Sequence, residues 1–144
     1  MSKYITKNFK YSEFSCPCCG KTRPINPNLI YRLQNLRDKI NKPIYISSGI
    51  RCKKENKRVG GYSRSPHMAG KAVDIYAKKT TLNDLALAAR DVGFTRVGLY
   101  KSFIHIDILR PVPSASWVRS KDRKYHYFKS LEEAITFEKI IQLW

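Results

Sequence analysis

Acidic residues are scarce in this chain, and this shortage restricts its partners more than any other feature of the composition. Of 144 residues, 11 are Asp or Glu and 28 are Lys or Arg, which gives a formal net charge of +17. The basic residues are spread along the chain and do not form one tail. Such an excess favours polyanionic partners, namely nucleic acid, anionic lipid or an acidic cell-wall polymer. Charge alone identifies none of them, because a well-solvated basic surface has the same composition.

Long apolar runs are also missing. No stretch approaches the length that crosses a bilayer, and the start, "MSKYITKNFKYSEF", lacks the apolar centre of a secretory signal. We therefore expect no membrane span and no signal-directed export. There are no internal repeats or low-complexity segments, and the length suits one domain over residues 1–144. Within it we expect an irregular N-terminal arm (1–24) and a C-terminal strand–helix extension (118–144) packed on the same core.

Signatures of nucleic-acid recognition are absent too. The sequence contains no helix-turn-helix pattern, no zinc-finger spacing and no aromatic RNA-binding motif. We therefore expect no specific nucleic-acid partner, and any binding to nucleic acid is expected to be nonspecific and sensitive to salt.

The spacing of apolar residues predicts an α+β fold. Helices are expected over 26–40, 80–93 and 130–144. Strands are expected over 43–47, 71–76, 96–100 and 103–109, with a short edge strand at 124–128. Residues 48–67 are expected to form a loop with one helical turn, and 110–117 a proline-containing linker. Because 96–100 and 103–109 are joined too tightly for a parallel crossover, we expect a small, mainly antiparallel sheet with helices packed on one side.

Four cysteines are present, and three of them lie in "CPCCG" as Cys16, Cys18 and Cys19, with Cys52 further on. Zinc sites usually space their cysteine pairs as C-x2-C, whereas this run is C-x-C-C. The residues are therefore compatible with free thiols, with a disulfide under oxidising conditions, or with a structural metal site. We do not expect them to be catalytic.

Histidine is rare, with three residues in the chain, and two of them lie near acidic strand residues. Side chains alternate between the two faces of a strand. In 103–109 the isoleucines share one face, and His105 and Asp107 share the other. In 71–76, Asp74 points away from the apolar face. If the two strands are neighbours, these three side chains converge, and His67 on the preceding loop can join them.

Two imidazoles and one carboxylate suit a divalent transition metal, above all Zn²⁺. With His67, Asp74 and His105 as ligands, the fourth tetrahedral position stays open for a water molecule whose pKa is lowered toward neutrality. This arrangement is typical of a hydrolase. The alternative is that the His–Asp pairs only form hydrogen bonds. His126 is expected to be an edge-strand or surface residue.

Two segments together resemble the zinc D-alanyl-D-alanine carboxypeptidase family. They are "ISSGIRCKKENKRVGGYSRSPHMAGKAVDI" and "GLYKSFIHIDI". This family includes bacterial cell-wall DD-peptidases and phage endolysin endopeptidases, and it shares its metal site with the hedgehog signalling domain. Its pattern is an S-G-x-R turn, then S-x-H-x-x-G-x-A-x-D, then a late strand with a second His. The matching residues here are Ser48, Gly49, Arg51, Ser65, His67, Gly70, Ala72, Asp74 and His105.

The resemblance implies a role for each matched position. His67, Asp74 and His105 correspond to the zinc ligands, and Arg51 to the residue that binds the substrate carbonyl or carboxylate. Ser65 is expected to orient the His67 loop or to contact substrate. Many members carry a glutamate as general base three residues before the second His, where this chain has Ser102. The nearest acidic residue is Asp107, which is expected to act either as the base or as a partner that fixes a histidine.

The resemblance covers roughly residues 8–110 and implies a zinc peptidase that hydrolyses peptidoglycan stem or cross-link peptides. We expect a monomer of phage or prophage type, made in the cytoplasm. It would reach the wall through a partner pore protein or as part of a virion, and its basic surface would hold anionic wall polymers. The alternative is a weakly active or inactive zinc-containing wall-binding module on the same fold, as the hedgehog domain suggests.

Overall fold

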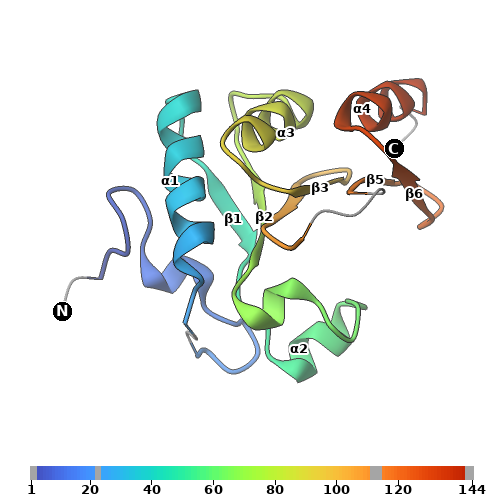
Figure 1. The fold of residues 1–144 in the computed structure, drawn as a ribbon. Helices are drawn as coiled ribbons and strands as arrows, with labels where there is room; N and C mark the ends of the chain where they lie inside the picture. Colours follow the sequence, from blue (N-terminus) through green and yellow to red (C-terminus); the bar gives the residue numbers. More distant parts are fainter. Residues whose placement is uncertain (1–2, 22–23, 111–114, 142–144) are drawn as a thin grey trace.

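A six-stranded sheet lies at the centre of the computed structural model, which describes residues 3–21, 24–110 and 115–141 (Figure 1). The strand order is β1-β2-β4-β3-β5-β6, and every neighbouring pair is antiparallel except β3–β5. The strands are β1 (Tyr45–Ser48), β2 (Ala72–Tyr76), β3 (Arg96–Leu99), β4 (Ile104–Asp107), β5 (Ser116–Arg119) and β6 (Tyr125–Phe128). The predicted α+β class with a mainly antiparallel sheet is confirmed.

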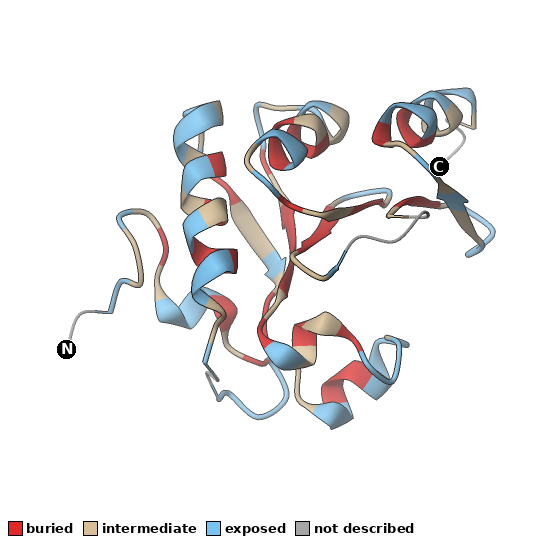
Figure 2. Cartoon of the chain, in the orientation of Figure 1, coloured by how far each residue is buried: buried red, intermediate tan, exposed pale blue. Residues whose placement is uncertain are grey.

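Three helices cover one face of this sheet: α1 (Pro27–Ile40), α3 (Leu82–Asp91) and α4 (Leu131–Ile140) (Figure 1). Each begins at a residue whose side chain accepts a hydrogen bond from a backbone N–H of the first turn, namely Asn26, Thr81 and Ser130. Their apolar sides join the inward residues of the strands in one hydrophobic core, which Figure 2 shows as the buried layer between helices and sheet. No helix in the described ranges is long and apolar enough to cross a membrane.

The shorter helical segments lie outside this helical layer. Helix α2 (Lys53–Arg58) forms within the predicted loop 48–67, and the 3₁₀ turn η2 (Pro66–Ala69) begins at its end. Helix α2 lies on the opposite side of the strands from α1 and α3 (Figure 1). A second 3₁₀ turn, η1 (Tyr11–Phe14), belongs to the N-terminal arm. The arm is anchored, because Phe14 has 1% of its surface exposed and packs in the core.

The C-terminal part differs from the prediction. Strand β5 begins inside the segment 110–117 that was predicted as a linker, of which 111–114 lie outside the described residues. It pairs in parallel with β3, so the extension continues the sheet. A four-residue strand next to two prolines gives too short an alternation to be recognised. Of the predicted arm and last helix, 1–2, 22–23 and 142–144 also lie outside the described residues.

Candidate metal centre

Strands β2 and β4 bring the acidic and histidine side chains together. They are antiparallel neighbours in which Asp74 lies directly opposite His105, as the predicted convergence required. The apolar residues on either side of these two, Val73, Ile75, Ile104 and Ile106, are buried in the core, on the other face of the sheet. His67 approaches from η2, which begins at Ser65, and the Ser65 hydroxyl accepts a hydrogen bond of 3.3 Å from the His67 backbone N–H.

The turn after His67 depends on a glycine. Gly70 ends η2 with φ +68°, in the left-handed region that side chains disfavour. A Cβ atom at this position would also lie 2.5 Å from the backbone oxygen of Pro24. The glycine therefore lets η2 pack closely against the chain before α1 and turn directly into β2.

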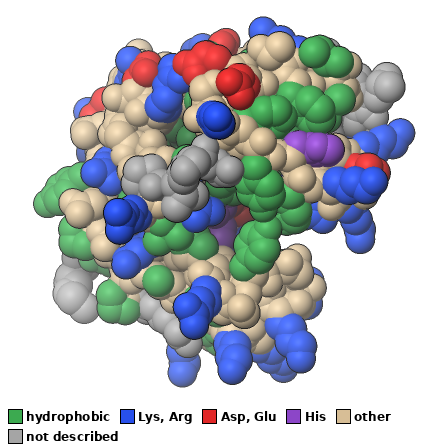
Figure 3. All heavy atoms as spheres, turned by 45° about the vertical axis from the view of Figure 1, so that its right-hand side comes forward, with side chains coloured by type: hydrophobic (Ala, Val, Ile, Leu, Met, Phe, Trp, Pro, Cys, Tyr) green, Lys and Arg blue, Asp and Glu red, His purple; other side chains and the backbone are tan. Residues whose placement is uncertain are grey.

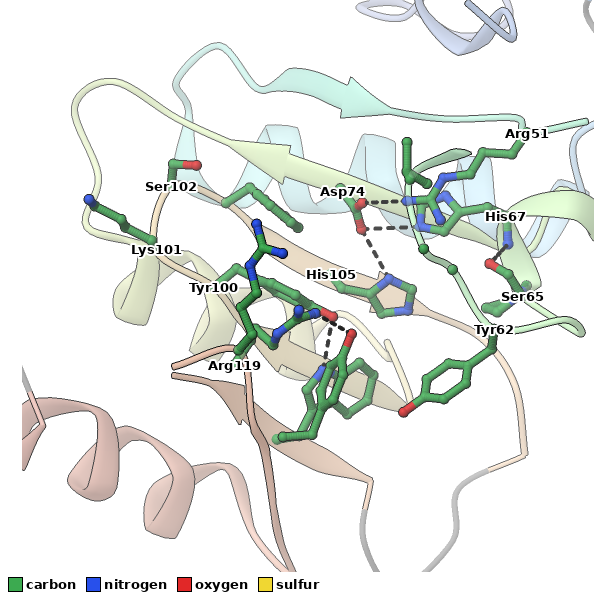
Figure 4. A pocket seen from close by; sticks show the side chains of 18 of the residues that line it. Arg51, Tyr62, Ser65, His67, Asp74, Tyr100, Lys101, Ser102, His105 and Arg119 are labelled. Carbon is green, nitrogen blue, oxygen red and sulfur yellow. Dashed lines mark hydrogen bonds and ion pairs between the residues drawn. The ribbon is translucent and has the colours of Figure 1, made fainter. Parts of the chain in front are cut away.

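The three predicted ligands offer donor atoms that all lie within 4.8 Å of one another. Nε2 of His67 is 3.1 Å from Oδ1 of Asp74, and Nδ1 of His105 is 3.0 Å from the same oxygen (Figure 4). All three residues are buried. Two imidazole nitrogens and one carboxylate oxygen at this separation fit a zinc ion.

Each histidine is oriented by a hydrogen bond on its other ring nitrogen. Nδ1 of His67 donates to the carbonyl oxygen of Gly49 over 2.9 Å, so Nε2 is the nitrogen that faces Asp74. Nε2 of His105 lies 2.7 Å from Oδ2 of Asp107, so Nδ1 is the nitrogen that faces Asp74. Because both contacts fix the ring planes, the nitrogens that face Asp74 are in place before any ligand binds.

The acidic and histidine side chains of the site shift one another's pKa values. Burial alone would raise the pKa of Asp74, but hydrogen bonds from His105 and His67 hold that pKa well below its usual range. Burial alone would lower the pKa of His105, but hydrogen bonds to Asp107 and Asp74 raise it to about 9. The Asp74 carboxylate is therefore charged. Because Asp74 and Asp107 favour the protonated form of His105, a metal cation has to displace that proton when it binds.

Arg51 lies beside the cluster. Its Nη2 donates to Oδ2 of Asp74 over 3.1 Å, its Nε to Ser48 over 3.0 Å, and its Nη1 to Asn56 over 3.3 Å. A guanidinium has five N–H donors, so these three bonds leave two for a substrate. The arginine is thus both anchored in the site and able to bind a carbonyl or carboxylate.

Asp107 lies behind His105. Its side chain is fully buried, its Oδ1 accepts from the backbone N–H of Leu109 over 3.1 Å, and Nε of Arg96 is 3.4 Å from its Oδ2. It is not among the residues that line the cavity described below. Since it contacts the ring nitrogen opposite the one that faces Asp74, its position favours the role of fixing His105 over that of a general base.

The substitution Asp107→Asn separates these two roles. We expect zinc affinity and hydrolysis to fall together, each by about 10–100-fold, because the partner that orients His105 is weakened. Zinc titration beside kinetics measures both, with the exposed Asp91→Asn as control. If hydrolysis falls while zinc affinity is unchanged, Asp107 acts as the base.

A cavity of about 1020 Å³ opens over the three residues. In Figure 3, histidine and acidic atoms show at the bottom of a hollow bordered by hydrophobic and basic side chains. Seven basic residues line it: Arg51, Arg58, Arg96, Lys101, Arg119, Lys121 and Arg123. Asp74 is the one carboxylate among the described lining residues. Ser102, where the family resemblance implies a glutamate, also lines the cavity.

Strands β5 and β6 supply part of this cavity, which the sequence did not reveal. Trp117, Arg119 and Tyr125 come from β5 and β6 and line it. The Trp117 ring lies 5.3 Å from that of His105, and its Nε1 donates to the Tyr100 hydroxyl over 3.3 Å. Burial raises the pKa of Tyr100 well above its usual value, so its phenol stays protonated.

A second contact crosses the cavity rim. The hydroxyl groups of Tyr62, after α2, and Tyr127, on β6, are 2.8 Å apart. Both side chains are otherwise exposed. The loop that follows α2 and the C-terminal extension therefore close one side of the cavity together.

Trp117 reaches His105 only because residue 98 is glycine. Strand β3 places Gly98 between His105 and Trp117, and a Cβ atom there would lie 2.3 Å from the indole ring. We expect Gly98→Ala to destabilise the protein by about 1–3 kcal/mol, measured by urea unfolding. In a Trp117→Ala background the same change should cost much less, and equal costs in the two backgrounds would refute the contact.

Comparisons with known proteins agree with this geometry. A model of the family described as peptidase M15 matches residues 7–107, which is more than half of the chain. The zinc D-Ala-D-Ala carboxypeptidase of Streptomyces albus G is 41% identical over 69 residues. Those residues are 47% of this chain and 27% of that protein, so the match spans about a quarter of the relative's length. The residues that β5 and β6 contribute to the cavity lie beyond the family match.

Proposed function

The chain belongs to the peptidase M15 family, and we propose that it is a zinc-dependent peptidase that hydrolyses peptidoglycan stem or cross-link peptides. Zn²⁺ is its cofactor, as the donor set of the site and the zinc-dependent relative indicate. The observation that carries the proposal is the convergence of His67, Asp74 and His105 on the floor of a cavity, at the positions that the family pattern assigns to metal ligands.

The residues around the proposed metal site have separate roles. Two histidines and one aspartate would hold zinc, and the bound ion would supply a Lewis acid for a water molecule and a substrate carbonyl. Gly49 and Asp107 fix the two imidazole rings. Arg51 keeps Asp74 in place and directs its two remaining N–H donors to the substrate carbonyl or to a terminal carboxylate.

The lining of the cavity supports an anionic peptide as substrate. Away from Asp74, the described lining carries basic side chains and no further carboxylate, so free carboxylates of a wall peptide would be attracted. The formal charge of +17 would concentrate the protein on anionic wall polymers. We further propose a monomeric enzyme of phage or prophage type that reaches the wall through a pore-forming partner or as part of a virion.

Digestion of purified peptidoglycan, followed by mass analysis of the released fragments, tests this function. We expect new peptide ends that disappear after treatment with a chelator and return when zinc is added. The masses of the ends identify the bond: removal of a terminal residue indicates a carboxypeptidase, and internal cleavage indicates an endopeptidase. Absence of new ends at full zinc occupancy would refute hydrolysis.

The serine at position 102 favours a second candidate function, that of a wall-binding module. A hydroxyl at the position of the usual glutamate removes the expected general base, which suits a zinc-containing module that binds the wall without cutting it. Sedimentation of the protein with peptidoglycan, measured in the digestion samples, distinguishes the binding module from the peptidase. Binding without release of fragments supports this module, whereas release of fragments excludes it.

A further inference from the structure

A second cluster of potential metal ligands lies in the N-terminal arm and at the start of α2. The ligand sulfur atoms of Cys16, Cys19 and Cys52 all lie within 4.8 Å of one another. Each of these cysteines is a free thiol, as is Cys18. Three thiols brought together from segments more than thirty residues apart meet the first requirement of a metal site.

The spacing of two cysteines in the arm matches that of one cysteine pair of a zinc site. Read as consecutive cysteines, "CPCCG" gives C-x-C-C, but the two residues whose sulfurs converge, Cys16 and Cys19, are separated by C-x2-C. Gly20 follows with φ +67°, and its N–H donates to the Cys16 carbonyl over 2.8 Å. The chain therefore folds back in a tight turn that holds both sulfurs on one side.

Backbone N–H groups point at these sulfurs. The N–H of Cys52 donates to Sγ of Cys16 over 3.4 Å, and the N–H of Glu55 donates to Sγ of Cys52 over 3.4 Å. Such donors stabilise thiolate, which is the form that binds metal.

We infer that Cys16, Cys19 and Cys52 form a second, structural zinc site, separate from the proposed catalytic centre. Soft thiolate ligands favour zinc over ions that prefer oxygen ligands, such as Mg²⁺ and Ca²⁺. Cys18 is exposed and its side chain contacts that of Cys52, but it is not among the three residues whose ligand atoms all converge.

The cysteine site lies where it can fix the position of Arg51. Cys52 caps the start of α2 and directly follows Arg51, whose guanidinium contacts Asn56 of the same helix. On the other side, the arm is joined to the segment between β1 and Arg51, because the N–H of Ile50 donates to the Phe14 carbonyl over 2.9 Å. Zinc at the three sulfurs would lock the arm to α2 and hold Arg51 in position beside Asp74.

Zinc content of the full chain, purified under reducing conditions, tests the inference. We expect about two zinc ions per chain in the wild type and about one in His67→Ala. Cys19→Ser should also retain about one, and the double variant should retain none. Cys18→Ser is the matched control from the same turn and should keep both ions. Because Cys19 is exposed, its replacement by serine leaves the core intact.

X-ray absorption at the zinc edge of the His67→Ala protein identifies the ligands of the remaining ion. A shell of sulfur at about 2.3 Å is expected, whereas nitrogen and oxygen ligands would lie at about 2.0–2.2 Å. The inference is overturned if this variant binds no zinc, if its zinc has no sulfur ligands, or if Cys18→Ser and not Cys19→Ser loses the ion. Since the proposed catalytic ligand is already removed, failure here leaves the proposed peptidase function untouched.

Discussion

His67→Ala is expected to abolish hydrolysis of peptidoglycan peptides, with a loss of at least about 1,000-fold. A metal that polarises a carbonyl contributes several kcal/mol to transition-state stabilisation, and each 1.36 kcal/mol corresponds to a factor of ten in rate. The substitution removes one of three ligand atoms that converge within 4.8 Å. Initial rates of fragment release, measured beside the zinc content of the same sample, give the result.

His126→Ala is the matched control for this variant. His126 lies on β6, its Nε2 is 3.0 Å from the Ser120 hydroxyl, and it is not among the described residues that line the catalytic cavity. It should retain full hydrolysis. If His67→Ala keeps more than a few per cent of wild-type activity, the ligand assignment is wrong.

Arg51→Ala is expected to lower kcat/KM by about 100–1,000-fold while zinc remains bound. Removal of a single donor to a developing oxyanion costs an amount of this order. The effect should persist at saturating zinc, because the donor atoms of the two histidines and Asp74 are unchanged. Steady-state kinetics on a defined wall peptide, with zinc content measured in parallel, checks both statements.

Two further variants decide what Arg51 does. Arg51→Lys keeps the charge but loses the fork of N–H donors, so it should recover little activity. Arg90→Ala removes a cation that pairs with Glu132 and is not among the described residues that line the cavity, so it should change kcat/KM only slightly. If Arg51→Ala reduces only the free energy of unfolding and leaves kcat/KM unchanged, the arginine is purely structural.

The face of the strand on which His105 and Asp74 each lie was predictable from the alternation of side chains along a strand. Isoleucines on every second position of β4 leave His105 on the opposite face, and the same argument places Asp74 on β2. The sequence could not show that β2 and β4 are neighbours, because hydrogen-bonded register is a long-range property. The resemblance to a known family supplied that link.

Three features of the structure lay outside such reasoning. Strand β5 has four residues and pairs in parallel with β3, so no hairpin turn marks it, and its contribution of Trp117 and Arg119 to the cavity was missed. The role of the cysteines stayed open among free thiols, a disulfide and a structural metal site, because adjacent cysteines hide which of them converge in space. Asp107 was left between two roles, and only its hydrogen bond to His105 favours one of them.

Anomalous diffraction at the zinc edge from crystals of the wild-type protein tests the central claim most directly. The account predicts a peak between Nε2 of His67, Oδ1 of Asp74 and Nδ1 of His105, with no anomalous signal there in His67→Ala crystals. A wild-type protein that releases peptidoglycan fragments but shows no metal at these three residues would contradict it.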